Sequence, residues 1–153
     1  MLQLKIQQLR IKPMFKKSVL ISLVPLLFTS LSAYDLKSNM LLLNEDLREV
    51  QRGFISSDQS GVEKAIKRFA QHSQELLGNK EKFSEMLPAN KKHKASEAVM
   101  SAQIISHNAQ IILDAIENKR NQSGIVRREE AQRAYTYIEH ACFRCHNLVR
   151  DEY

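Results

Sequence analysis

The sequence predicts an all-α protein, and three observations lead to this class. The chain has 153 residues, enough for one domain preceded by a leader. It contains only 4 Gly, 3 Pro and no Trp, whereas its second half is rich in residues that favour helix. After residue 35, apolar residues recur at steps of three and four, which is typical of amphipathic helices.

Residues 1–33 are expected to be a leader that the mature protein lacks. A basic segment from Met14, an apolar run over 19–31 and small residues up to Ala33 follow the order of a secretory signal peptide. Pro25 and several hydroxyl residues interrupt the run, which is shorter than the roughly 20 apolar residues of a transmembrane helix. We therefore expect a cleaved signal peptide, export to the periplasm and no membrane anchor in the mature form.

The mature chain is expected to begin at Ala33 or Tyr34, and residues 34–153 form the predicted domain. Residues 1–13 precede a signal that is complete without them, so Met14 is a candidate for the true start. Five basic residues and no acidic ones lie in the leader, which leaves 18 basic and 17 acidic residues in the mature part. Nucleic acid is therefore not expected as a partner, since it requires a basic folded domain.

Four amphipathic segments separated by polar turns predict the architecture of this domain. The longest connection, residues 79–91, contains Pro88 and is expected to be a loop with at most a short helical turn. With the other connections short, we expect an antiparallel up-down-up-down four-helix bundle. The predicted helices span residues 36–53, 60–77, 92–119 and 126–150.

The motif that carries chemistry lies near the C-terminus. Cys142 and Cys145, the only cysteines, are followed directly by His146 in the C-x-x-C-H arrangement of c-type haem attachment. In such sites two thiols add to the haem vinyl groups and the adjacent imidazole binds the iron. We therefore expect one covalent haem c with His146 as an axial ligand.

Two other uses of the cysteines are less consistent with the sequence. A C-x-x-C pair can serve as a redox dithiol or as a thiol switch in a bundle without haem. Redox dithiols usually open a helix in a βαβ setting, whereas this pair lies near the end of a predicted helix. A zinc site would need four ligands, and the sequence has no second cluster to supply them.

Met40 is the candidate for the second axial ligand. If the first and fourth helices are antiparallel, Met40 and His146 lie at about the same depth from one end, roughly 7.5 Å. His72, near the end of the second helix, is the rival ligand and is otherwise expected to be partly exposed. His107 is too far along its helix, and His140 points about 120° away from His146.

This combination resembles the cytochrome c′ family of class II c-type cytochromes. Four helices and a C-terminal C-x-x-C-H motif carry the resemblance, and residues 35–40 are also similar to the first helix of periplasmic four-helix b-type cytochromes. The resemblance implies that Met40 ligates the iron opposite His146, as in the low-spin branch. Val149 departs from the family pattern, which commonly has an aromatic residue there, whereas Arg150 fits it.

The function expected from these features is one-electron transfer, with no substrate transformed, so the protein is not expected to be an enzyme. The partners would be redox proteins, and many members of the resembling family form homodimers, which the sequence leaves open. Arg144 and Arg150 are candidate propionate contacts. The basic run over residues 91–94 either faces the propionates or an acidic redox partner or is a solvated helix start. The alternative function is a high-spin protein that binds nitric oxide or carbon monoxide without Met40 on the iron.

Overall fold

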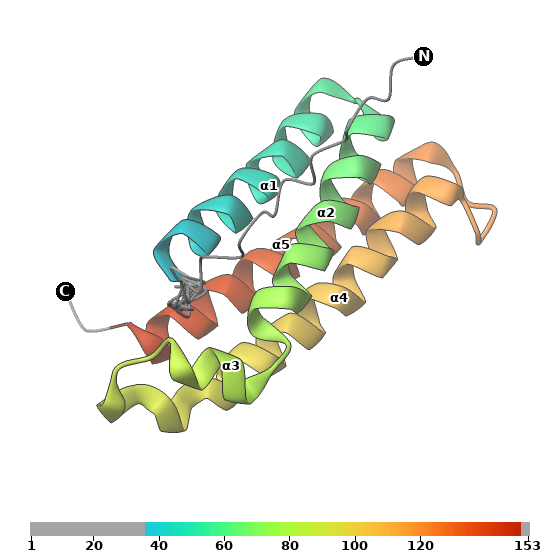
Figure 1. The fold of residues 1–153 in the computed structure, drawn as a ribbon. Coiled ribbons are helices and arrows are strands. Elements are labelled where there is room, and N and C mark those ends of the chain that lie inside the picture. Colours follow the sequence, from blue (N-terminus) through green and yellow to red (C-terminus); the bar gives the residue numbers. More distant parts are fainter. Residues whose placement is uncertain (1–35, 151–153) are drawn as a thin grey trace, which may run out of the picture. The chain divides into compact units, whose positions relative to one another are not determined.

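The computed structural model describes residues 36–150, and all regular structure in this part of the chain is helical (Figure 1). The prediction of an all-α protein is confirmed. The expected leader and its cleavage site lie outside the described residues. The elements are α1 (Leu36–Ser56), α2 (Gln59–Leu77), α3 (Lys80–Glu85), the 3-10 helix η1 (Ala89–Lys94), α4 (Ala95–Glu117) and α5 (Gly124–Val149).

The turn between α1 and α2 shows why α1 continues past its predicted end at Gly53. Gly53 is buried in the helix against α2, where an added Cβ would lie 2.7 Å from Cγ2 of Val62. The glycine thus permits a close helix approach and does not end α1. Ser57 then takes a left-handed conformation with φ of 58°, and Asp58 caps α2 by accepting a hydrogen bond from the Gly61 N–H at 2.9 Å.

The connection predicted as a loop over residues 79–91 is largely helical. Asn79 caps α3 by accepting from the Lys82 N–H at 2.8 Å, and Phe83 of α3 is buried in the core. The 3-10 helix η1 follows Pro88, so α4 begins at Ala95 and not at residue 92. The sequence pattern missed these elements because six residues are too few to establish a helical periodicity.

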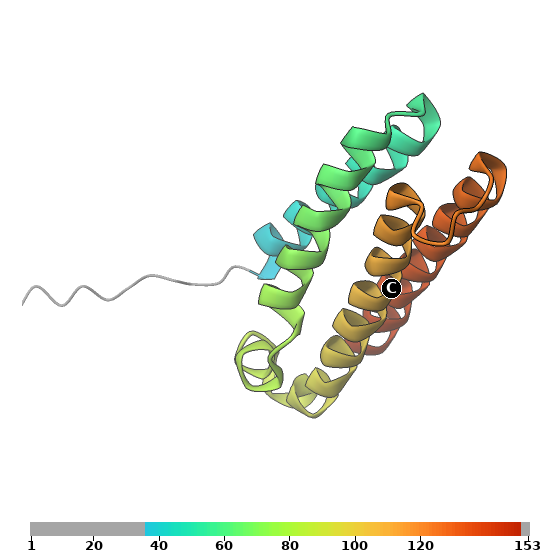
Figure 2. The ribbon, with the colours of Figure 1, turned by 90° about the vertical axis from the view of Figure 1, so that its right-hand side faces the viewer.

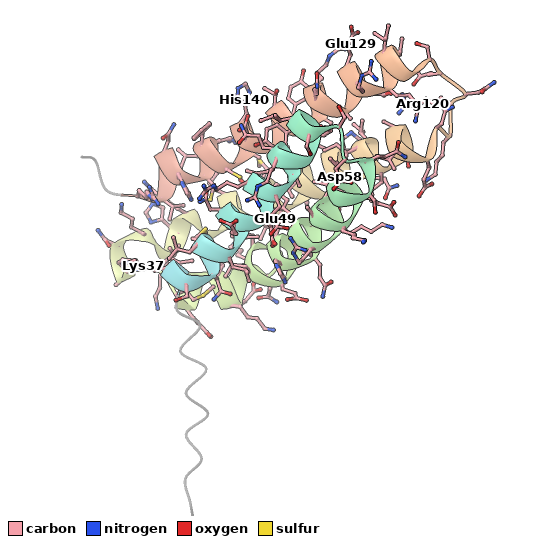
Figure 3. All side chains as sticks on the ribbon, turned by 90° about the horizontal axis from the view of Figure 1, so that it is seen from above. Lys37, Glu49, Asp58, Arg120, Glu129 and His140 are labelled. Atoms are coloured by element: carbon pink, nitrogen blue, oxygen red, sulfur yellow. The ribbon has the colours of Figure 1, made fainter. Side chains whose placement is uncertain are left out.

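Consecutive long helices pack against each other: α1 on α2, α2 on α4 and α4 on α5. The start of α1, α3, η1 and the end of α5 gather at one end of the molecule, which we call the motif end (Figures 1 and 2). The opposite end holds the α1–α2 and α4–α5 turns, where Figure 3 labels Asp58 and Arg120; we call it the turn end. No helix among the described residues is long and apolar enough to cross a membrane.

The core runs between the long helices and combines large apolar side chains with small ones. Phe69 of α2, Ile105 and Ile112 of α4 and Ile138 of α5 are all at most 1 % exposed. Five alanines of α4 and three of α5 are buried as well, and these small side chains allow the two helices to approach closely. The closely packed α4–α5 pair carries the cysteine motif.

Candidate functional site

A ring contact shows which faces of α1 and α5 are directed toward each other. Phe54 of α1 and Tyr135 of α5 meet edge to face, with ring centroids 5.8 Å apart and planes at 79°. Cys142 and His146 follow Tyr135 by seven and eleven residues, so at 3.6 residues per turn both lie within about 20° of it around α5. The cysteine motif therefore lies on the face of α5 that is directed toward α1.

Met40 lies on the corresponding face of α1. It precedes Phe54 by fourteen residues, which places it within about 40° of Phe54 around the helix. From the ring contact, Met40 is about 21 Å along α1 and His146 about 16 Å along α5, both toward the motif end. The two residues thus differ in depth by about one helical turn.

Between these two faces the helices are less closely packed than elsewhere. Among the described helices, α1 and α5 are not one of the closely packed pairs. The apolar side chains along this seam near the motif end, Leu36, Met40 and Val149, are only partly buried. We call this region the α1–α5 seam.

The two cysteines differ in their surroundings. Cys145 is 4 % exposed and lies on the α4 side, near Ser101, whose hydroxyl donates to the Ala141 carbonyl at 3.2 Å. Cys142 is partly buried on the seam, and both thiols are free. Because they are three residues apart on a helix, the two sulfur atoms lie on adjacent parts of one face.

Both thiols are protonated at neutral pH. Burial, then Cys145 and Glu139, raise the pKa of Cys142 to about 11. Burial also raises the pKa of the Cys145 thiol, although the Ser101 hydroxyl lowers it in part. Their position in the last turns of α5 gives no compensation, since thiolates are stabilised at helix N-termini and not at C-termini.

His146 is held in the form that binds metals. Burial, followed by the positive charge of Arg150, lowers the pKa of its imidazole, so the neutral ring dominates at pH 7. Within residues 36–150 no hydrogen bond holds either ring nitrogen. A neutral imidazole on a half-buried face is suited to ligate iron.

The two arginines predicted to contact propionates have different environments. Arg144 directs its Nη2 to the Glu97 carboxylate of α4 at 3.3 Å, an exposed ion pair that the sequence did not suggest. Arg150 is exposed at the end of α5, close enough to His146 to affect its pKa. Contact of either residue with a propionate stays a prediction.

The basic run over residues 91–94 has a structural role that neither sequence interpretation foresaw. Lys91, only 9 % exposed, donates from Nζ to the Val149 carbonyl at 2.9 Å, and Lys94 donates to the Leu148 carbonyl at 2.7 Å. These carbonyls end α5 and have no partner within the helix. The two lysines of η1 therefore cap the helix that carries Cys142 and His146.

The rival ligand His72 is bound to a buried carboxylate. Its Nδ1 lies 2.6 Å from Oδ2 of Asp46, which is 3 % exposed and also accepts from Nε of Arg68 at 2.6 Å. Arg68 pairs with Glu49 as well. This cluster lies between α1 and α2, so His72 is directed to Asp46. The sequence does indicate that Asp46 faces the core, because it lies three residues after Leu43 and four before Val50 on the apolar stripe of α1.

The remaining histidines of the described chain are on the surface. His93 of η1, His107 of α4 and His140 of α5 are exposed, and Figure 3 shows His140 on the outside of its helix. Residues 36–150 contain no group of three or more His, Cys, Asp or Glu side chains placed to hold a metal ion. No protein-family model, curated protein or solved structure matches this chain.

Proposed function

We propose that this protein is an exported mono-haem c-type cytochrome that carries single electrons in the periplasm. In this proposal the four long helices form an antiparallel up-down-up-down bundle, and residues 1–33 are a leader that includes a cleaved signal peptide. Haem, when bound, supplies an iron that alternates between the ferric and ferrous states. The electron would come from one redox protein and pass to another.

The observation that carries the proposal is the pairing of two helix faces. The face of α5 with Cys142 and His146 is turned toward the face of α1 with Met40, as the Phe54–Tyr135 contact indicates. From that contact, His146 and Met40 differ in depth by about one helical turn and Cys142 and Met40 by about two, all toward the motif end of the α1–α5 seam. The Cys142 thiol, an imidazole and a thioether on this seam, with the Cys145 thiol beside them toward α4, match the needs of a covalently bound, six-coordinate haem.

Each residue would have a distinct role in holding the group. The Cys142 and Cys145 sulfurs would each form a thioether bond as S–H adds across a vinyl double bond, the thiol proton passing to the vinyl carbon. The neutral imidazole of His146 and the thioether of Met40 would be the two protein ligands of the iron. The apolar residues of the α1–α5 seam would exclude water, and His/Met ligation would raise the reduction potential.

The properties of the thiols favour this role over redox dithiol chemistry. Disulfide exchange needs a thiolate, and reactive C-x-x-C pairs have a depressed pKa at a helix N-terminus. Here the pKa of both thiols is raised, and the pair is in the last turns of α5. A thiol switch in a haem-free bundle would therefore react slowly at neutral pH.

Optical spectra test the ligand assignment. Protein produced with a cytochrome c assembly system should be six-coordinate and low-spin in both oxidation states. Met40→Ala should become high-spin and bind carbon monoxide rapidly when ferrous, whereas His72→Ala should leave the spectrum unchanged. If His72→Ala alone became high-spin, His72 would be the ligand. A five-coordinate spectrum of the unmutated protein would replace electron transfer by gas binding, since an open iron position is what nitric oxide or carbon monoxide requires.

A further inference from the structure

A cavity of about 160 Å³ lies at the turn end of the molecule, far from the α1–α5 seam at the motif end. It opens between the α1–α2 turn and the α4–α5 turn, which Figure 3 marks by Asp58 and Arg120. Apolar side chains from all four long helices form much of its wall: Phe54, Val62, Ala115, Ile116 and Ala131. Apolar cavities of this size hold one ring of six carbon atoms.

Two arginines from the first turns of α5 line the same cavity. Arg127 donates from Nη1 to the Ala115 and Ile116 carbonyls at 3.1 and 3.3 Å, while its Nε is buried without a partner. Arg128 is exposed and has no hydrogen-bond or ion-pair partner in the described part of the chain. Its Nη1 lies 4.0 Å from where a Cβ of Gly124 would be, so the guanidinium folds back over the start of α5.

The start of α5 adds to this positive potential. Its first turn has no acidic residue, and the Ser123 side chain accepts only from the Val126 N–H. The N–H groups of Gly124 and Ile125 have no acceptor among residues 36–150. The positive charges of these arginines and the positive N-terminal end of the helix dipole repel each other, and a bound anion would offset that repulsion.

We propose that this cavity binds a small monocarboxylate with an apolar body of about six or seven carbon atoms. The carboxylate would lie between Arg128 and the first N–H groups of α5, with Nε of Arg127 on its inner side. The body of the ligand would lie against Phe54, Val62 and Ala115. A planar carboxylate matches the guanidinium fork, and the apolar wall would discriminate against inorganic anions.

Calorimetric titration of the purified mature protein with benzoate tests the proposal, with benzyl alcohol and inorganic phosphate as comparison ligands. Benzoate should bind, and the two comparison ligands should each bind at least about tenfold more weakly. Benzyl alcohol has the apolar ring but no carboxylate, and phosphate has the negative charge but no apolar body. Arg128→Gln should weaken benzoate about tenfold through loss of a charged hydrogen bond, while Arg133→Gln, an exposed arginine outside the cavity, should have no effect.

Ala131→Leu provides a second variant, which fills the cavity and leaves both arginines in place. It should abolish benzoate binding while the circular dichroism spectrum stays helical. The proposal is overturned if benzoate does not bind at millimolar concentration, or if phosphate binds as tightly as benzoate. It is also overturned if Arg128→Gln and Arg133→Gln have the same affinity for benzoate. These outcomes do not depend on haem, because the cavity lies at the other end of the molecule.

Discussion

Replacement of Lys91 by Met removes the buried donor that caps α5 and keeps most of the apolar stem. A hydrogen bond from a charged donor contributes about 1.5–3 kcal/mol, and the freed Val149 carbonyl can recover part of this from water at the helix end. The substitution also removes the ammonium group, whose burial costs free energy in the folded protein, and this offsets part of the loss. We therefore expect a loss of about 1–2 kcal/mol, or roughly 3–8 °C in Tm for a domain of this size.

Urea denaturation followed by circular dichroism measures this loss, with all variants compared at the same haem content. Lys94→Met removes the neighbouring, exposed cap and should lose only about 0.5 kcal/mol. Lys92→Met removes an exposed lysine without such a bond and should change nothing. Equal stability of the Lys91 and Lys92 variants would refute the capping argument.

Three further predictions concern the potential, the pH dependence and the core. Met40→Ala should lower the reduction potential of the haem protein in a redox titration, because the thioether ligand is lost; an unchanged potential would argue against Met40 as ligand. In the haem-free protein the pKa of His146 is lower in the folded state than in the unfolded state, so the unfolded state binds more protons. The free energy of unfolding should therefore fall as the pH drops below about 6.5. Urea titrations at several pH values should show that His146→Gln reduces this fall. Phe69→Ala should destabilise by about 3–5 kcal/mol, because the side chain is 1 % exposed in the core; a loss below about 1 kcal/mol would show that the site collapses.

Helical class and helix positions could be predicted because long apolar periodicities dominate this sequence. The stripe of α1 that includes Met40, Leu47 and Phe54 is partly buried or buried, as its spacing indicates. Short elements such as α3 could not be predicted, since their helical geometry depends on tertiary burial of single residues such as Phe83. The predicted end of α1 was wrong because Gly53 packs against α2 and does not end the helix, which again depends on tertiary contacts.

For the candidate site, local spacing predicted which residues share a face but not what surrounds them. The spacing of Cys142 and His146 placed both on one side of a helix, and the structure turns that side toward α1. The caps from Lys91 and the pairing of His72 with Asp46 could not be predicted in the same way. These contacts join residues 26–58 positions apart, and their partners are a backbone carbonyl and a carboxylate with no local sequence signature.

Covalent attachment of haem is the central claim, and intact-protein mass spectrometry after acid-acetone extraction tests it most directly. Protein exported with a cytochrome c assembly system should begin at Ala33 or Tyr34 and carry the added mass of one haem. Cys142→Ala and Cys145→Ala should each weaken attachment, and the double variant should carry no added mass, because these are the only thiols in the chain. An unmutated protein without the added mass, or a double variant that retains it, would contradict the account.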